Sequence, residues 1–174
     1  MAAAIVALVA LGGYFLFSSS GGPTHVITIP VGFGGYTQSP SLATATHEQE
    51  LQRAIVSGAS GEVKNVQAQV YERISGPGTK VGPEIMGFIG GNLTTGSAST
   101  MIGDVMSLMR GSFATDPGAL GGQAACAAGS HGSPAICAWA DNDTFGVIFS
   151  PTLSPSELAS VMRQLRPLAE HLAK

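Results

Sequence analysis

The stretch ICAWADNDTFGVIF, residues 136–149, reads as a tight β-hairpin. An Asn-Asp pair at 142–143 suits a two-residue loop, and apolar runs of strand-forming side chains flank it. With this loop, Trp139 lies opposite Gly146, so the only tryptophan of the chain covers a glycine on the neighbouring strand. Both faces of the hairpin are largely apolar. We therefore predict that it lies in the middle of a sheet covered on both sides, or at a buried partner surface.

Cys126 and Cys137 are the only cysteines, and they flank a turn-rich stretch at residues 129–134. A hairpin closed by that stretch places the two directly opposite each other. An even number of cysteines behind an export-type segment favours a disulfide, which contributes about 3 kcal/mol for so short a loop. A pair of reduced, buried thiols is the alternative. A zinc site is less favoured because the spacing is not C-x-x-C.

The C-terminal region carries the strongest local helix signal. Ser154 is placed as the N-cap, with Pro155 at the first helical position and Glu157 at the third. One side of the helix is then apolar, through Leu158, Val161, Met162, Leu165 and Leu172. We expect Pro167 to kink or end the regular helix. Three basic side chains are expected to face outward: Arg163, Arg166 and Lys174.

A second helix is predicted at residues 99–110, and it holds Met101, Met106 and Met109, three of the six methionines. Methionine-rich surfaces are adaptable, so a pocket between this helix and Trp139 is the candidate ligand or partner surface. The alternative interpretation is that these methionines fill the core.

The remaining patterns complete the fold prediction. Strands are expected at residues 25–31, 62–74, 85–89, 123–128 and 135–150, and a short helix is expected from residue 46 to about residue 57. This order predicts an α+β domain with one antiparallel sheet and about three helices packed mainly on one face, and an α/β arrangement is the alternative. The domain is expected to span residues 25–174.

The N-terminal segment predicts the location. Residues 1–17 carry no charge, and the first charged residue of the chain is Glu48. A helix over residues 2–17 is roughly 24 Å long, slightly short of a bilayer core of roughly 30 Å. We expect residues 1–20 to form a transmembrane anchor in contact with membrane lipid, followed by a linker at residues 21–24. A cleaved signal peptide is the alternative. The basic segment that usually precedes the apolar run is missing from both interpretations, which leaves open whether the natural chain starts before Met1.

Composition excludes several classes of protein. Charged residues make up 11% of the 174 residues and the net charge is -3, which argues against a nucleic-acid-binding surface. The hydrophobic fraction of 44% argues against disorder. After removal of the N-terminal segment, the chain has the size of one compact domain.

No motif predicts catalysis, a cofactor or a metal. His25, His47, His131 and His171 are scattered and show no metal-ligand spacing. Neither a G-x-S-x-G elbow nor a phosphate-binding glycine loop occurs. Residues 141–146 superficially resemble a calcium loop, but a phenylalanine occupies a ligand position, so a hairpin turn explains them better.

The C-terminal third resembles one group of proteins. The segment GGQAAC at residues 121–126, the segment CAWADNDTFGV at 137–147 and the SPSEL helix start at 154–158 are similar to uncharacterised single-anchor proteins of high-GC actinobacteria. The resemblance implies a membrane-anchored, extracytoplasmic location and no activity, and no functional residues carry over. In that group a basic or proline-rich stretch precedes the anchor, and this sequence lacks one.

The leading hypothesis is a membrane-tethered, extracytoplasmic interaction module that is not an enzyme and binds a protein or an envelope component. A small-ligand sensor or carrier is the alternative. A hydrolase that uses His47 or His131 with an unplaced serine is a third, less favoured hypothesis.

Overall fold

The structure is a computed structural model, and it describes residues 25–39, 53, 63–73, 82–94, 98–107, 111–129 and 134–173. The predicted anchor at 1–20, the linker at 21–24 and all but one residue of the helix expected from residue 46 lie outside this part of the chain. None of the described helices is long and apolar enough to cross a membrane.

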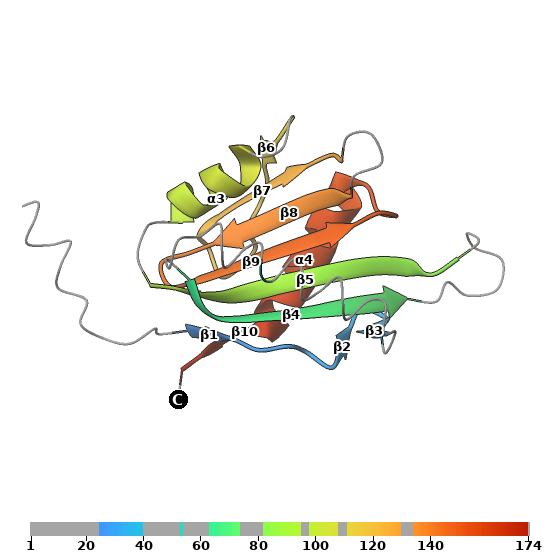
Figure 1. Ribbon diagram of the computed structural model, residues 1–174, viewed down its shortest axis with the longest axis horizontal. Helices are drawn as coiled ribbons and strands as arrows, with labels where there is room; N and C mark the ends of the chain where they lie inside the picture. The colour runs from blue at the N-terminus through green and yellow to red at the C-terminus, as the bar shows by residue number, and fades with distance from the viewer. Residues whose placement is uncertain are drawn as a thin grey trace, which may run out of the picture.

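Eight strands form one antiparallel sheet, which confirms the central feature of the predicted α+β class (Figure 1). Short strands lie at both of its edges, a feature that limits pairing with other chains. Across the sheet the strands are β2 (Gly32–Phe33), β3 (Tyr36–Gln38), β4 (Val63–Arg73), β5 (Glu84–Leu93), β9 (Thr144–Ser150), β8 (Ala135–Ala140), β7 (Gln123–Ala127) and β6 (Phe113–Ala114).

The predicted hairpins have the predicted register. In β8 and β9, Trp139 pairs with Gly146, and the two strands lie inside the sheet between β7 and β5. In β7 and β8, Cys126 pairs with Cys137, and the two form a disulfide. Local turn chemistry and alternation were therefore sufficient to align these three strands.

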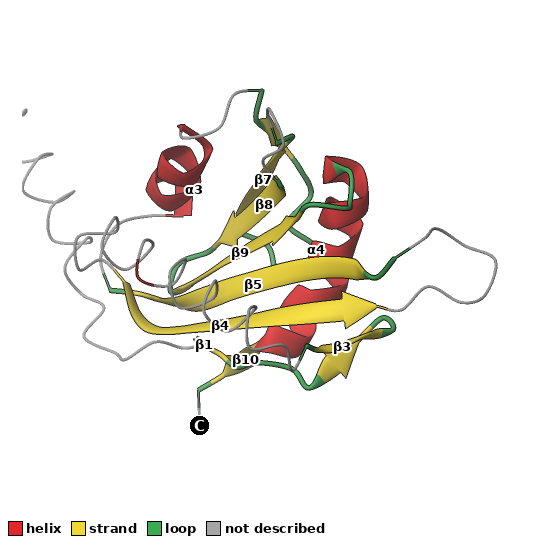
Figure 2. Ribbon diagram, turned by 45° about the vertical axis from the view of Figure 1, so that its right-hand side comes forward, coloured by secondary structure: helices red, strands yellow, loops and turns green. Residues whose placement is uncertain are grey.

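The helices differ from the prediction. The two helices that the structure describes over their length lie on opposite faces of the sheet and not mainly on one face (Figure 2). On one face, Ile102 of α3 (Ala98–Ser107) belongs to a core cluster with Ala138. On the other, Met162 of α4 (Pro155–Ala169) belongs to a cluster with Trp139. The reason lies in the predicted hairpin: both of its faces carry apolar side chains, so a helix has to shield each face from water.

The start of α4 is as predicted. The Ser154 hydroxyl accepts a hydrogen bond from the Glu157 amide, while the Glu157 carboxylate accepts one from the Ser154 amide. This capping box satisfies two amides that a helix start leaves without partners. Pro167 lies in the last turn, and the helix ends two residues later at Ala169.

The two ends of the domain pair with each other, a feature that the sequence analysis did not predict. Strands β1 (His25–Ile27) and β10 (Glu170–Leu172) form a separate two-stranded antiparallel sheet, in which His25 lies opposite Leu172. The Thr28 amide extends this pairing with a 2.8 Å hydrogen bond to the Ala169 carbonyl. The described chain thus begins and ends side by side, along one margin of the domain (Figure 1).

Candidate functional site

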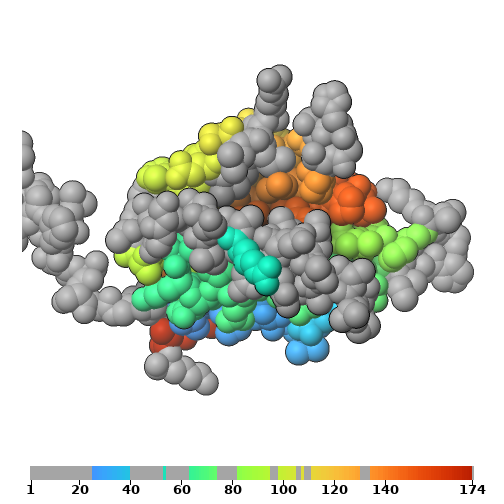
Figure 3. All heavy atoms as spheres, viewed as in Figure 1, coloured from blue at the N-terminus to red at the C-terminus, as the bar shows by residue number. Residues whose placement is uncertain are grey.

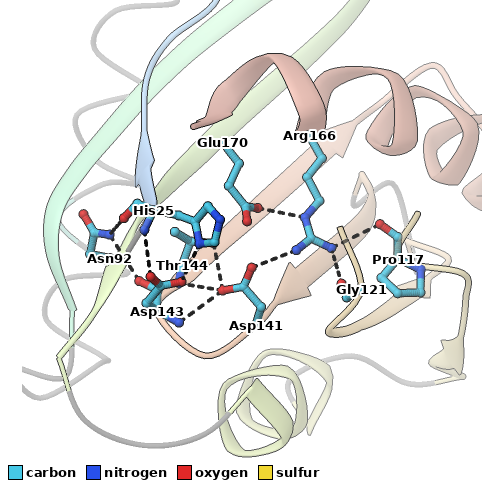
Figure 4. Close-up of polar contacts among 9 residues, drawn as sticks. All are labelled: His25, Asn92, Pro117, Gly121, Asp141, Asp143, Thr144, Arg166 and Glu170. Atoms are coloured by element: carbon cyan, nitrogen blue, oxygen red, sulfur yellow. Dashed lines mark hydrogen bonds and ion pairs between the residues drawn. The ribbon is translucent and has the colours of Figure 1, made fainter. Parts of the chain in front are cut away.

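Within the described residues, a large group of interacting polar side chains lies where the β8–β9 turn meets the ends of the domain. We call it the terminal polar cluster and define it by Arg166, Asp141, Glu170, Asp143, Thr144, His25 and Asn92 (Figure 4). Its members come from β1, β5, the β8–β9 turn and its flank, α4 and β10.

The turn is built around the Asp141 carboxylate. Its Oδ1 atom accepts hydrogen bonds from the Asp143 amide at 3.1 Å, from the Thr144 amide at 2.8 Å and from the Thr144 hydroxyl at 3.0 Å. An aspartate before a two-residue loop commonly folds back on the amides that follow it. The same carboxylate therefore closes the hairpin with one oxygen and leaves the other for Arg166.

Arg166 joins three distant parts of the chain. Its side chain is 1% exposed, and all three guanidinium nitrogens donate to groups of the protein. Nε contacts Glu170 at 2.9 Å, one terminal nitrogen contacts Asp141 at 2.9 Å, and the other contacts the carbonyls of Pro117 and Gly121 at 3.1 and 2.5 Å. A buried guanidinium needs such partners, because desolvation of an unpaired charge is costly.

The two carboxyl groups beside Arg166 have shifted pKa values of opposite sign. Burial by itself raises the pKa of Asp141, but hydrogen bonds from Glu170, Thr144 and the Asp143 amide outweigh it and lower that pKa to about 2. Burial, together with the hydrogen bond to Asp141, raises the pKa of Glu170 despite the opposing effect of Arg166. The pair thus shares a proton more readily than two separate carboxyl groups would.

The other half of the cluster holds the first strand. The His25 amide donates to Asp143 at 2.8 Å, and the His25 ring nitrogen Nδ1 lies 3.3 Å from the second Asp143 oxygen. The side-chain amide of Asn92, which is fully buried, donates to the His25 carbonyl at 2.8 Å and to the Asp143 carbonyl at 3.2 Å. Strand β1 is therefore tied to the β8–β9 turn through backbone and side-chain bonds together.

This arrangement fixes the ends of the domain rather than presenting groups to a ligand. Arg166 is enclosed and directs every nitrogen to the chain itself. Among the residues that the structure describes, no group of three or more His, Cys, Asp or Glu side chains is placed to hold a metal ion. The chemistry that the cluster provides is electrostatic: one buried guanidinium pairs with two carboxyl groups and closes the ends of the domain.

Arg166 is enclosed by the domain, so the prediction that it faces outward is wrong. The missed signal is its spacing: Arg166 follows Met162 by four residues and precedes Ala169 by three, and both of these are fully buried. Glu170, four residues further on, supplies an oppositely charged partner at helical distance.

The residues of the predicted ligand surface do not come together. Trp139 is fully buried on the α4 face, where its ring stacks on Phe88 with centroids 5.7 Å apart. Met101 belongs to α3 and packs from that helix against the core cluster on the opposite face. The Met106 side chain and Met109 lie outside the described part of the chain. Trp139 and Met101 thus cannot line one pocket, because the sheet separates them.

The histidines of the hydrolase hypothesis, His47 and His131, also lie outside the described residues. His171 is exposed in β10, and His25 belongs to the terminal polar cluster.

Comparison of the chain with family models, with curated proteins and with solved structures finds no match.

Proposed function

We propose that this chain is a membrane-tethered, extracytoplasmic interaction module that binds a protein or an envelope component and has no catalytic activity of its own. Residues 1–20 serve as the anchor and residues 25–174 as the domain. The observation that carries the proposal is the Cys126–Cys137 disulfide, because such bonds persist on the oxidising side of a membrane. The resemblance of the C-terminal third to single-anchor actinobacterial proteins supports the same location.

The way in which β1 is held supports a tether at this end of the domain. A tether that precedes residue 25 transmits any pull directly to β1. That strand pairs with β10 and is bound by Asp143 and Asn92. A domain attached through its first strand needs such fixation, since terminal strands otherwise fray easily.

Location is tested by fractionating bacteria that express the full chain. We expect the protein in membranes after alkaline extraction, with its domain open to a protease added outside spheroplasts and with no thiol that reacts with maleimide before reduction. Recovery in the soluble cytoplasmic fraction with two reactive thiols would contradict the proposal.

Partner binding is tested by cross-linking intact cell envelopes and purifying the full chain. The matched control is a version with residues 1–24 fused to an unrelated domain. Enrichment of an envelope component with the full chain alone supports an interaction module, and identical profiles for the two proteins argue against it.

A small-ligand sensor or carrier is the second candidate function, and one observation favours it. Within the described part of the chain, the Trp139 indole Nε1 is the only buried side-chain nitrogen or oxygen without a hydrogen-bond partner. A buried donor of this kind suits a small polar guest or a water molecule. Titration of Trp139 fluorescence with envelope extracts tests this function, and a signal that does not saturate rejects it.

A further inference from the structure

One margin of the domain combines exposed apolar side chains with the first and last described segments. Six large hydrophobic side chains of the described residues are exposed, and three of them lie here: Val31 at 83%, Leu168 at 46% and Leu172 at 72%. We call the exposed part of residues 25–34 and 167–173 the terminal edge. In Figure 3 the blue N-terminal segment and the red C-terminal end share the lower margin of the molecule.

The terminal edge carries almost no charge. Residues 25–34 contain no Asp, Glu, Lys or Arg, and residues 167–173 contain only Glu170. The Glu170 side chain is 1% exposed and turned toward Arg166. An exposed apolar surface without charges is unusual for a surface that faces only water, and it often marks a contact with a membrane or a protein.

The chain length limits how far this edge can lie from the predicted anchor. In the two-stranded sheet His25 lies directly opposite Leu172. The chain from residue 20 to residue 25 reaches at most about 18 Å when fully extended. An anchor that ends at residue 20 therefore keeps His25, and Leu172 beside it, near the headgroup layer of the bilayer.

We propose that the terminal edge is a second membrane contact, in which Leu172, Leu168 and Val31 sit in the interfacial layer of the bilayer next to the anchor. This inference rests on the proposed function, since it requires residues 1–20 to be in the membrane. The occupant is the lipid surface, because the edge exposes three large apolar side chains, exposes no Asp, Glu, Lys or Arg within these residues and is continuous with the anchored end of the chain. An uncharged edge enters the interfacial layer without the cost of dehydrating ionised groups. The domain then lies against the membrane instead of hanging freely from its linker.

The test uses the full chain in phosphatidylcholine–phosphatidylglycerol vesicles, with its native disulfide intact. A third cysteine is introduced singly and labelled with an environment-sensitive fluorophore. Leu172→Cys reports on the edge beside the anchored end, Val31→Cys reports further along the edge, where Tyr71 bonds to the Pro30 carbonyl, and Ala10→Cys reports on the anchor. The matched control is Ile85→Cys, also apolar and 40% exposed, at the end of β5 that lies away from His25 and Leu172. Leu93, the last residue of β5, bonds to the β8–β9 turn and lies about 26 Å from Ile85 along the strand.

Quenching by lipids with a spin label near the headgroup gives the readout, and iodide reports exposure to water. We expect the labels at 172 and 31 to be quenched by lipid several-fold more strongly than the label at 85. Lipid quenching at 10 with equally weak quenching at 172, 31 and 85 would overturn the inference and leave the anchor intact. Protection of 172 from both quenchers would also overturn it, because a protein or a second copy would then cover the edge. Absence of quenching at 10 would overturn the proposed anchor, and the edge contact with it.

Discussion

Arg166 is the residue on which the terminal polar cluster depends. It is the only cation that the structure places against both Asp141 and Glu170, and its side chain is 1% exposed. Replacing it with methionine keeps the volume and apolar stem but leaves two carboxyl groups without their partner. We expect Arg166→Met to lower the free energy of unfolding by about 3–5 kcal/mol in urea denaturation, as for other broken buried pairs.

The matched control for this substitution is Arg163→Met, in the same helix but partly exposed, with an expected change within about 0.5 kcal/mol. Adding Asp141→Asn and Glu170→Gln to Arg166→Met should recover part of the loss, because the uncompensated charges are then gone. Equal losses for Arg163→Met and Arg166→Met would contradict this role.

Gly146 is required by the tryptophan on the neighbouring strand. A Cβ atom at this position would overlap the six-membered ring of Trp139, which is itself held by Phe88. We expect Gly146→Ala to destabilise the domain by about 1–3 kcal/mol through this overpacking, measured by thermal or urea unfolding.

Gly103 provides the comparison for Gly146→Ala. It is exposed within α3, and a Cβ atom there would meet nothing within 4 Å. Gly103→Ala should stabilise the domain by about 0.5–1 kcal/mol, since alanine is the better helix former. If both alanine variants were neutral, the close packing of Trp139 on Gly146 would not matter for stability.

At the scale of elements, the β7–β8 hairpin is joined by both its ladder and its disulfide. Cys126 and Cys137 are fully buried, and their Cα atoms are 4.1 Å apart. The two cysteines are 11 positions apart in the sequence. Replacing both with alanine removes the cross-link between them, which should lower the free energy of unfolding by about 3 kcal/mol in the chain-entropy model. Urea unfolding of the oxidised protein and of the double variant measures the difference. A fall of well under 1 kcal/mol would show that the hairpin is held by its packing alone.

The elements that could be predicted from sequence are those defined by neighbours along the chain. The β8–β9 turn, its register and the capping box of α4 each depend on residues within a few positions of one another. The opposite placement of α3 and α4 was missed although its cause was visible, because apolar side chains on both faces of the hairpin require two covers. The short strands β3 and β6 carry no pattern long enough to recognise.

At the scale of the whole molecule, the least predictable features are the contacts between the two ends of the domain. His25 and Asp143 are 118 positions apart, and Thr28 and Ala169 are 141 positions apart. No local rule links such residues, since the loop-closure cost is repaid only once the sheet has formed. The candidate site was hidden for the same reason, because its carboxylates, its guanidinium and its carbonyls come from separate segments.

The whole domain should show an acid-shifted stability profile because of this cluster. The raised pKa of Glu170 contributes stability that is fully present below its ordinary value of 4.5 and is lost as pH rises through the folded-state value. The lowered pKa of Asp141 contributes stability that is present above pH 3.8, the ordinary pKa of this group, and is lost as the pH falls toward about 2. We therefore expect the free energy of unfolding to be higher near about pH 5 than near about pH 8.

Glu170→Gln separates the two contributions. Glutamine stays neutral, can still accept a hydrogen bond from Arg166 and can donate one to Asp141. The fall in the free energy of unfolding above pH 4.5 should therefore flatten in the variant, while the loss of stability below pH 3.8 remains. Urea unfolding from about pH 3 to about pH 8 gives both profiles. The other ionisable groups at the cluster, Arg166, Asp143 and His25, are unchanged in the variant and serve as the common background. If the free energy of unfolding of the two proteins had the same pH dependence above pH 4.5, Glu170 would be ionised in the folded domain, and Arg166 would balance two full negative charges.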